Sequence, residues 1–225
     1  MSKKTTISGI VLVLLVLATT PLLGTDNVSF LKWWLMTLVI GIGFYPVTAA
    51  LFPRFHDRGW MFSKVLGIAV SGFAVFVLGS FGILSFTTSV CLGLVGALIL
   101  VSWIFGCFKV RVHAPEIDFL MMEEVLFFAF FLLWTYLAGF HPEAHGTEKF
   151  MDYGFMKAIM RSTAVPAEDL WYSGSGINYY YGGQFYAVFL TKITFTDVKQ
   201  TYHLMRTMVA AFAFVLPFSI TYHLT

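Results

Sequence analysis

Long apolar runs that are almost free of charge constrain this chain more than any other feature. Charged residues make up 12% of its 225 residues and hydrophobic residues make up 58%, whereas soluble domains carry about twice that share of charge. An α-helix of about 20 residues crosses a bilayer with its backbone hydrogen bonds satisfied internally. We therefore predict an all-α, polytopic transmembrane helix bundle, which makes this an integral membrane protein in contact with lipids.

The apolar runs predict about seven spans. The sixth is short and has Lys192 near its end, and the first lacks a clear cleavage motif, so we interpret it as a retained helix. The spans cover residues 7–23, 30–52, 62–86, 88–107, 120–140, 183–197 and 205–223.

Because the chain ends on "FSITYHLT", without a polar tail, we expect it to be part of a longer protein.

The basic residues predict an orientation for these spans. Ten of the fourteen Lys and Arg fall on one side, including Lys192, Lys199 and Arg206, which lie between the sixth and seventh spans. Since Lys and Arg favour the cytoplasmic side, the N-terminus is predicted to be cytoplasmic and the loop at 141–182 extracytoplasmic. The net charge of +2 is too small to indicate a nucleic-acid partner, and the oligomeric state stays undefined.

The loop at 141–182 is the most unusual part of the chain. Loops of this length are uncommon and are often functional, and this one holds five of the twelve acidic residues. Within it, residues 149–162 place apolar side chains at helical spacing, which predicts an amphipathic helix on the outer membrane surface.

Carboxylates in two places are candidates for chemistry. Glu148 and Asp152 are four residues apart and share a helix face, so they can act as a general base, ligate a divalent cation, or form an ordinary solvated face. Glu123 and Glu124 lie near the start of the fifth span. We interpret them as interfacial, with the helix beginning near Val125.

Aromatic and amide side chains cluster before the sixth span. Aromatic residues commonly form a belt at the membrane interface, but three consecutive tyrosines cannot all face one side. We therefore expect at least one ring to face a substrate cleft, where aromatic faces and amides suit a sugar. The candidate substrate-binding residues are Lys149, Arg161, Trp171, Asn178, Tyr179, Tyr180, Tyr181 and Gln184.

Three separated blocks, "GTEKFMD", "PAEDLWYSG" and "GINYYYGGQ", resemble the YYY membrane-protein family. The resemblance covers about residues 119–225, and it implies that this region is preceded by a separate four-helix membrane region at residues 1–118. That family in turn resembles the GT-C glycosyltransferases, which take a sugar from a polyprenyl-phosphate lipid. The resemblance implies that Glu148 is the catalytic base, with Asp152 a turn later. A leaving lipid phosphate needs positive charge beside it, and Lys149, Lys157 and Arg161 are the candidates for that role.

We therefore expect a membrane glycosyltransferase that uses a lipid-linked sugar donor at the extracytoplasmic face. A transporter or channel subunit, and a non-catalytic membrane scaffold, are the alternatives.

Overall fold

The computed structural model describes residues 2–109, 115–143, 146 and 148–224. In this part of the chain every regular element is a helix, as predicted. The elements in order are α1 (Lys3–Leu23), the short 3-10 turn η1 (Gly24–Asp26), α2 (Asn27–Leu51), α3 (Trp60–Ser80), α4 (Thr88–Lys109), α5 (Ile117–Ala138), α6 (Lys149–Arg161), α7 (Gly182–Thr194) and α8 (Val198–Leu224).

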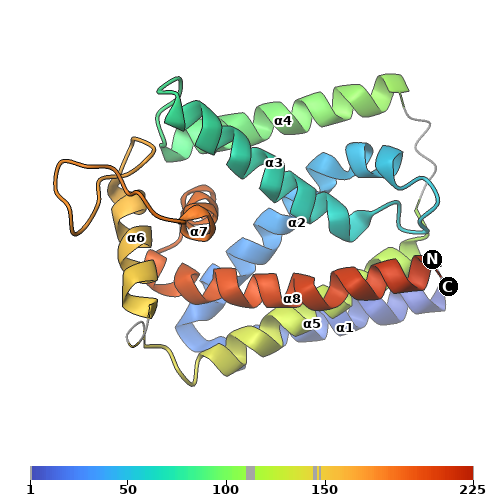
Figure 1. Ribbon diagram of the computed structural model, residues 1–225. Coiled ribbons are helices and arrows are strands. Elements are labelled where there is room, and N and C mark those ends of the chain that lie inside the picture. Colours follow the sequence, from blue (N-terminus) through green and yellow to red (C-terminus); the bar gives the residue numbers. More distant parts are fainter. Residues whose placement is uncertain (1, 110–114, 144–145, 147, 225) are drawn as a thin grey trace.

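The long helices run between two ends of the bundle (Figure 1). One end holds both chain termini and the connection between α2 and α3, and we call it the terminal end. The other holds α6, the 162–181 segment and the start of α8, and we call it the loop end. The predicted division at residue 118 stays a prediction, although α5 packs on both α1 and α8 and so joins the two predicted regions.

Apolar side chains cover the outside of the bundle as well as its core. On α1, for example, Ile10, Leu14 and Leu17 are more than half exposed, which suits a helix that faces lipid. Four stretches of the described chain are long and apolar enough to cross a membrane, and the first contains both α1 and α2. They are Lys3–Leu51, Trp60–Ser80, Thr88–Gly106 and Val198–Leu224.

Helix α7 differs from the sixth span that the sequence predicts. It has 13 residues and is therefore about 20 Å long, which is too short for a hydrocarbon core of about 30 Å. Figure 1 shows it nearly end-on, across the direction of α8. Its residues from Ala187 to Thr194 are all buried, so its apolar character reflects a protein core.

The position of α7 changes the charge balance between the two ends. Lys192 Nζ donates to the carbonyl of Met160 at the end of α6, at 3.2 Å. Lys192, Lys199 and Arg206 therefore lie at the loop end, opposite to the predicted side. With these three moved, the Lys and Arg of the described residues number six towards the terminal end and seven at the loop end, and they no longer favour an orientation. Arg111 lies outside the described residues.

Close helix packing relies on glycine where α2 meets α3. A Cβ at Gly67 would lie 2.3 Å from Ile40 Cγ2, and one at Gly41 would lie 2.8 Å from Lys64 Cγ. Small residues of this kind let membrane helices approach closely.

Helix α5 begins eight residues before the predicted start at Val125. It starts at Ile117, and Glu123 and Glu124 lie inside the bundle with 0% and 3% of their surfaces exposed. The predicted helix start near Val125 is therefore wrong, and the interfacial position of the two glutamates stays a prediction. Glu124 is buried there because Lys64, Trp34 and Trp60 of other helices bind its carboxylate.

Candidate functional site

A cavity of about 360 Å³ opens at the loop end where α6, α7 and α8 meet. Each of the three helices contributes a polar group and an apolar wall to it. The lining residues are Asp152, Met156, Gly183, Gln184, Ala187, Tyr202, Met205, Arg206 and Val209.

Asp152 is the carboxylate of this cavity, and its position is fixed by two helices. It lies in the first turn of α6, where its backbone N–H donates to the carbonyl of Glu148 at 3.0 Å. Its Oδ1 accepts a hydrogen bond from Gln184 Nε2 of α7 at 2.7 Å. The apolar face of α6, including Phe155 and Ile159, is buried, so the helix cannot turn Asp152 away from the cavity.

Arg206 is the basic group of the same cavity, and it also borders a second one. Its guanidinium lies 5.6 Å from the ring of Tyr202, one turn earlier on α8. The second cavity, of about 330 Å³, combines two further basic or titratable side chains with an apolar wall. It is lined by Trp134, Leu137, Ala138, His141, Lys149, Arg206, Thr207 and Ala210.

The three tyrosines point in different directions. Tyr181 is buried near Phe76 of α3, at 6.1 Å between ring centroids, whereas Tyr180 is 71% exposed. Tyr179 stacks on Tyr180 at 4.0 Å and donates a hydrogen bond to its hydroxyl at 2.6 Å.

Among the three tyrosines, Tyr179 packs against α6, the helix that carries Asp152. Its ring lies 5.7 Å from that of Phe155 on α6. The hydrogen bond to Tyr180, partial desolvation and the nearby carboxylates of Glu148 and Asp152 raise the pKa of Tyr179 to about 12.

Glu148 precedes α6 and is exposed, and the cavity lining includes Asp152 but not Glu148. A divalent cation held by this pair stays a prediction. Of the two predicted acids, only Asp152 lines the cavity, whereas both lie close enough to Tyr179 to raise its pKa.

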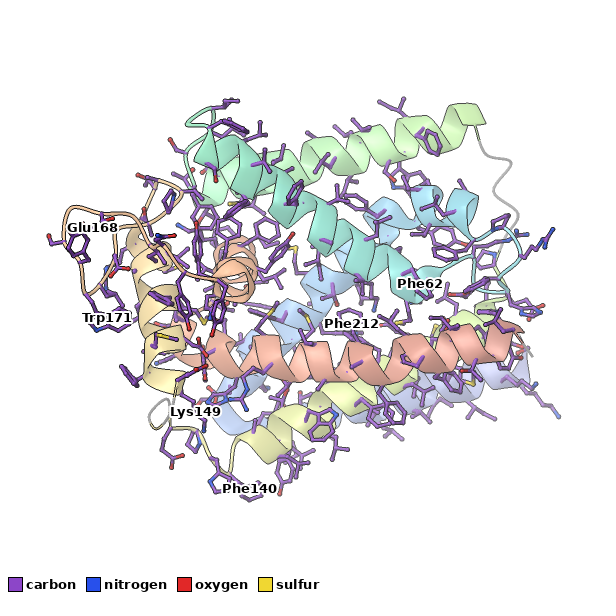
Figure 2. All side chains as sticks on the ribbon, viewed as in Figure 1. Phe62, Phe140, Lys149, Glu168, Trp171 and Phe212 are labelled. Atoms are coloured by element: carbon purple, nitrogen blue, oxygen red, sulfur yellow. The ribbon has the colours of Figure 1, made fainter. Side chains whose placement is uncertain are left out.

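The remaining predicted residues are spread over the loop end. Figure 2 shows Lys149 at one end of α6, and Trp171 and Glu168 on the segment beyond it. Trp171 is exposed and packs edge-on against Phe155 at 5.3 Å. Asn178 is also exposed.

Arg161 lies away from Asp152, in a separate cavity. That cavity, of about 420 Å³, also holds Glu168, Asp169 and Ser173. Asp169 accepts backbone hydrogen bonds from Trp171 and Tyr172, at 2.7 and 3.0 Å, and so shapes this segment. Of the predicted substrate-binding residues, only Gln184 joins Asp152 in the same cavity.

Sequence reasoning missed Arg206 and Tyr202. Their spacing of four residues on a helix was a usable signal, because it places a cation over an aromatic ring. The predicted sixth span, at residues 183–197, placed Arg206 on the opposite side of the membrane from the loop, so the sequence did not connect it with Asp152.

A second polar group, which the sequence did not predict, is buried near the terminal end. Lys64 Nζ lies 2.5 Å from Glu124 Oε2, and the two side chains are 0% and 4% exposed. The indole N–H groups of Trp34 and Trp60 donate to the same carboxylate at 2.8 and 2.9 Å. Donors on α2 and α3 thus satisfy the buried carboxylate of Glu124.

Comparison with protein families gives one match. The family described as "Uncharacterized membrane protein (DUF2298)" matches residues 70–225, which is more than half of the chain. Comparisons with curated proteins and with solved structures found no match. The matched segment runs from α3 to α8 and contains every residue of the two cavities that Arg206 borders. The chain belongs to the DUF2298 family of membrane proteins.

Proposed function

We propose that this protein is a membrane glycosyltransferase-like enzyme that binds a lipid-linked sugar phosphate at the loop end. The observation that carries this proposal is the position of Arg206 between two cavities. One of them contains the carboxylate of Asp152, and the other contains Lys149 and an apolar wall. A lipid-linked sugar phosphate has a matching group for each of these: a sugar beside Asp152, a phosphate between Arg206 and Lys149, and a lipid tail along the apolar wall.

Asp152 is the proposed general base. As the acceptor hydroxyl attacks the anomeric carbon of the sugar, its proton passes to the Asp152 carboxylate. The bond between the anomeric carbon and the phosphate oxygen breaks, and the lipid phosphate leaves with the electron pair. Gln184 holds Oδ1 of Asp152 at 2.7 Å, which leaves the second oxygen available for the acceptor.

Arg206 and Lys149 are the proposed binding groups for the leaving phosphate, because charge-assisted hydrogen bonds to phosphate are strong. Trp134 and Leu137, in the same cavity, are 43% and 44% exposed on the outside of α5. An exposed apolar surface on a membrane helix faces lipid, so a polyprenyl chain can lie along it.

Tyr179 and Tyr180 form the proposed platform for the sugar ring. Their stacked rings are accessible, and the hydroxyls of a sugar can exchange hydrogen bonds with theirs. In this arrangement α1 to α5 and α8 cross the membrane, α7 does not, and the loop end faces the extracytoplasmic side.

A transporter or channel subunit is the second candidate. The buried Lys64–Glu124 pair favours it, since ionisable residues inside a membrane commonly mark ion pathways. The enzyme accounts for more of the described groups, because the cavity with both a carboxylate and an arginine lies at the loop end, away from that pair.

The proposed function is tested by measuring binding and turnover together in lipid nanodiscs. Native mass spectrometry measures retention of undecaprenyl phosphate, and a radiolabelled polyprenyl-phosphate hexose measures consumption. We expect Arg206→Gln to weaken retention about tenfold or more, since it removes a charged phosphate contact. Lys199→Gln, which removes an exposed charge outside both cavities, should retain the lipid like the wild type.

The rate at which the sugar donor is consumed distinguishes Asp152 from Glu148 as the general base. Asp152→Asn should lower the rate by about 10²- to 10⁴-fold without weakening retention, and the loss should exceed that of Glu148→Gln. Glu143→Gln serves as the control for removal of a loop carboxylate. Equal retention by Arg206→Gln and the wild type, or an unchanged rate for Asp152→Asn, would overturn the assignment.

A further inference from the structure

Three potential metal ligands meet at the terminal end, far from the cavities at the loop end. Asp57 comes from the connection between α2 and α3, Glu123 from α5, and His223 from the last turn of α8. One ligand atom from each lies within 4.8 Å of the other two. His223 Nε2 and Asp57 Oδ1 are 2.9 Å apart. Figure 1 shows these three segments converging where the N and C labels lie.

Asp57 is held rigidly at this point. Its Oδ1 accepts a hydrogen bond from the backbone N–H of Gly59 at 3.1 Å, and its Oδ2 accepts one from Trp60 at 2.6 Å. These are the first N–H groups of α3, which no carbonyl of that helix can satisfy. The same carboxylate therefore caps α3 and faces the cluster.

His223 is oriented by its surroundings in the same way. Phe55 stacks on its ring at 4.2 Å, and Phe119 meets the ring edge at 4.9 Å. Nδ1 of His223 lies 3.2 Å from Nδ1 of His56. The backbone N–H of His56 lies 3.4 Å from the same nitrogen. In the tautomer with the ring proton on Nδ1, His56 Nδ1 accepts that proton, and Nε2, which faces Asp57 Oδ1 at 2.9 Å, is then a metal ligand with an outer-shell partner.

Glu123 is the group without a partner. It is 0% exposed, and neither carboxylate oxygen makes a hydrogen bond within the described part of the chain. Its polar neighbours are Asp57, Ser219 and Glu124. The nearby cation, Lys64, is already paired with Glu124. Two buried carboxylates side by side are costly unless a cation or a shared proton lies between them.

We propose that Asp57, Glu123 and His223 form a binding site for one divalent transition-metal ion of the zinc class. One imidazole nitrogen and two carboxylate oxygens are ligands that zinc accepts, at about 2.0–2.2 Å from the ion. Ligand atoms already within 4.8 Å of one another need only a small movement to share it. Bound metal would tie α5, α8 and the α2–α3 connection together, whether or not the loop end is an enzyme site.

The test uses the purified chain in nanodiscs, stripped with EDTA and reloaded separately with Zn²⁺ and Mn²⁺. Elemental analysis should find about one zinc per chain, and zinc should raise the Tm of the wild type. Glu123→Gln, which keeps the shape of the side chain, should lower the zinc affinity at least about tenfold, and so should His223→Gln. Glu143→Gln, an exposed acid in the loop, should bind zinc like the wild type.

Two results would overturn the proposal. One is a wild-type chain that keeps no more zinc or manganese than the Glu123→Gln variant. The other is a Tm that zinc leaves unchanged while Glu123→Gln raises it, because that would show two carboxylates sharing a proton. If Glu123→Gln does not fold, His223→Gln and the wild-type metal content still decide the question.

Discussion

A buried group of charged side chains near the terminal end contrasts with the exposed charges around the candidate site at the loop end. Near the terminal end, Lys64, Glu123 and Glu124 are almost completely buried, and Glu124 is satisfied by Lys64 and two tryptophans. At the loop end, Glu148 and Arg206 are exposed, and Asp152 borders an open cavity.

This difference separates groups that hold the helices together from groups that are free to meet a ligand. Buried ion pairs leave a large penalty when one partner is removed, whereas exposed charges contribute little to stability. Substitutions near the terminal end should therefore change folding, and substitutions at the loop end should change binding or turnover.

The largest expected effect is on the buried ion pair. Lys64→Met leaves the Glu124 carboxylate buried without its cation, which should lower the free energy of unfolding by roughly 3–5 kcal/mol. Lys149→Met at the loop end should change it by no more than about 0.5 kcal/mol. Thermal unfolding in detergent, followed by tryptophan fluorescence, compares the two variants.

A second substitution sharpens this result. Adding Glu124→Gln to Lys64→Met removes the unpaired charge and keeps an amide oxygen for Trp34 or Trp60. The double variant should regain a large part of the lost stability. If Lys64→Met unfolds no more easily than Lys149→Met, the contrast between the two ends is wrong.

A smaller effect is expected from glycine packing. Gly67→Ala places a Cβ 2.3 Å from Ile40 Cγ2, and overpacking of this kind costs about 1–3 kcal/mol. Gly182→Ala at the loop end is the matched control, because a Cβ there meets nothing within 4 Å. A Tm that falls equally in both variants would contradict the difference in packing.

Much of the helical architecture could be predicted from the sequence, because it depends on local patterns. The apolar runs gave the long helices, and the apolar stripe predicted a helix over residues 149–162, which the structure shows as Lys149–Arg161. The membrane character also follows from these runs and agrees with the family match.

The predictions that failed depend on contacts between distant residues. Helix α7 is apolar because α2, α4, α6 and α8 surround it, and hydropathy alone does not distinguish a protein core from lipid. Glu124 is buried because Lys64, Trp34 and Trp60 meet it from other helices. Arg206 reaches the cavity of Asp152 only because α7 stays at the loop end.

The side of the membrane on which α8 begins tests the central claim most directly, because Asp152 and Arg206 can share a cavity only at one end. Ser173→Cys and Lys199→Cys, introduced separately, are treated in intact cells with an impermeant thiol reagent, and the unsubstituted chain reports background from the native cysteines. The account predicts that both positions react in intact cells, because both lie at the loop end, which is proposed to face the extracytoplasmic side. Reaction of both only after lysis would reverse that orientation and leave the shared cavity intact. Reaction of one position in intact cells and of the other only after lysis would mean that α7 crosses the membrane, and would separate Asp152 from Arg206.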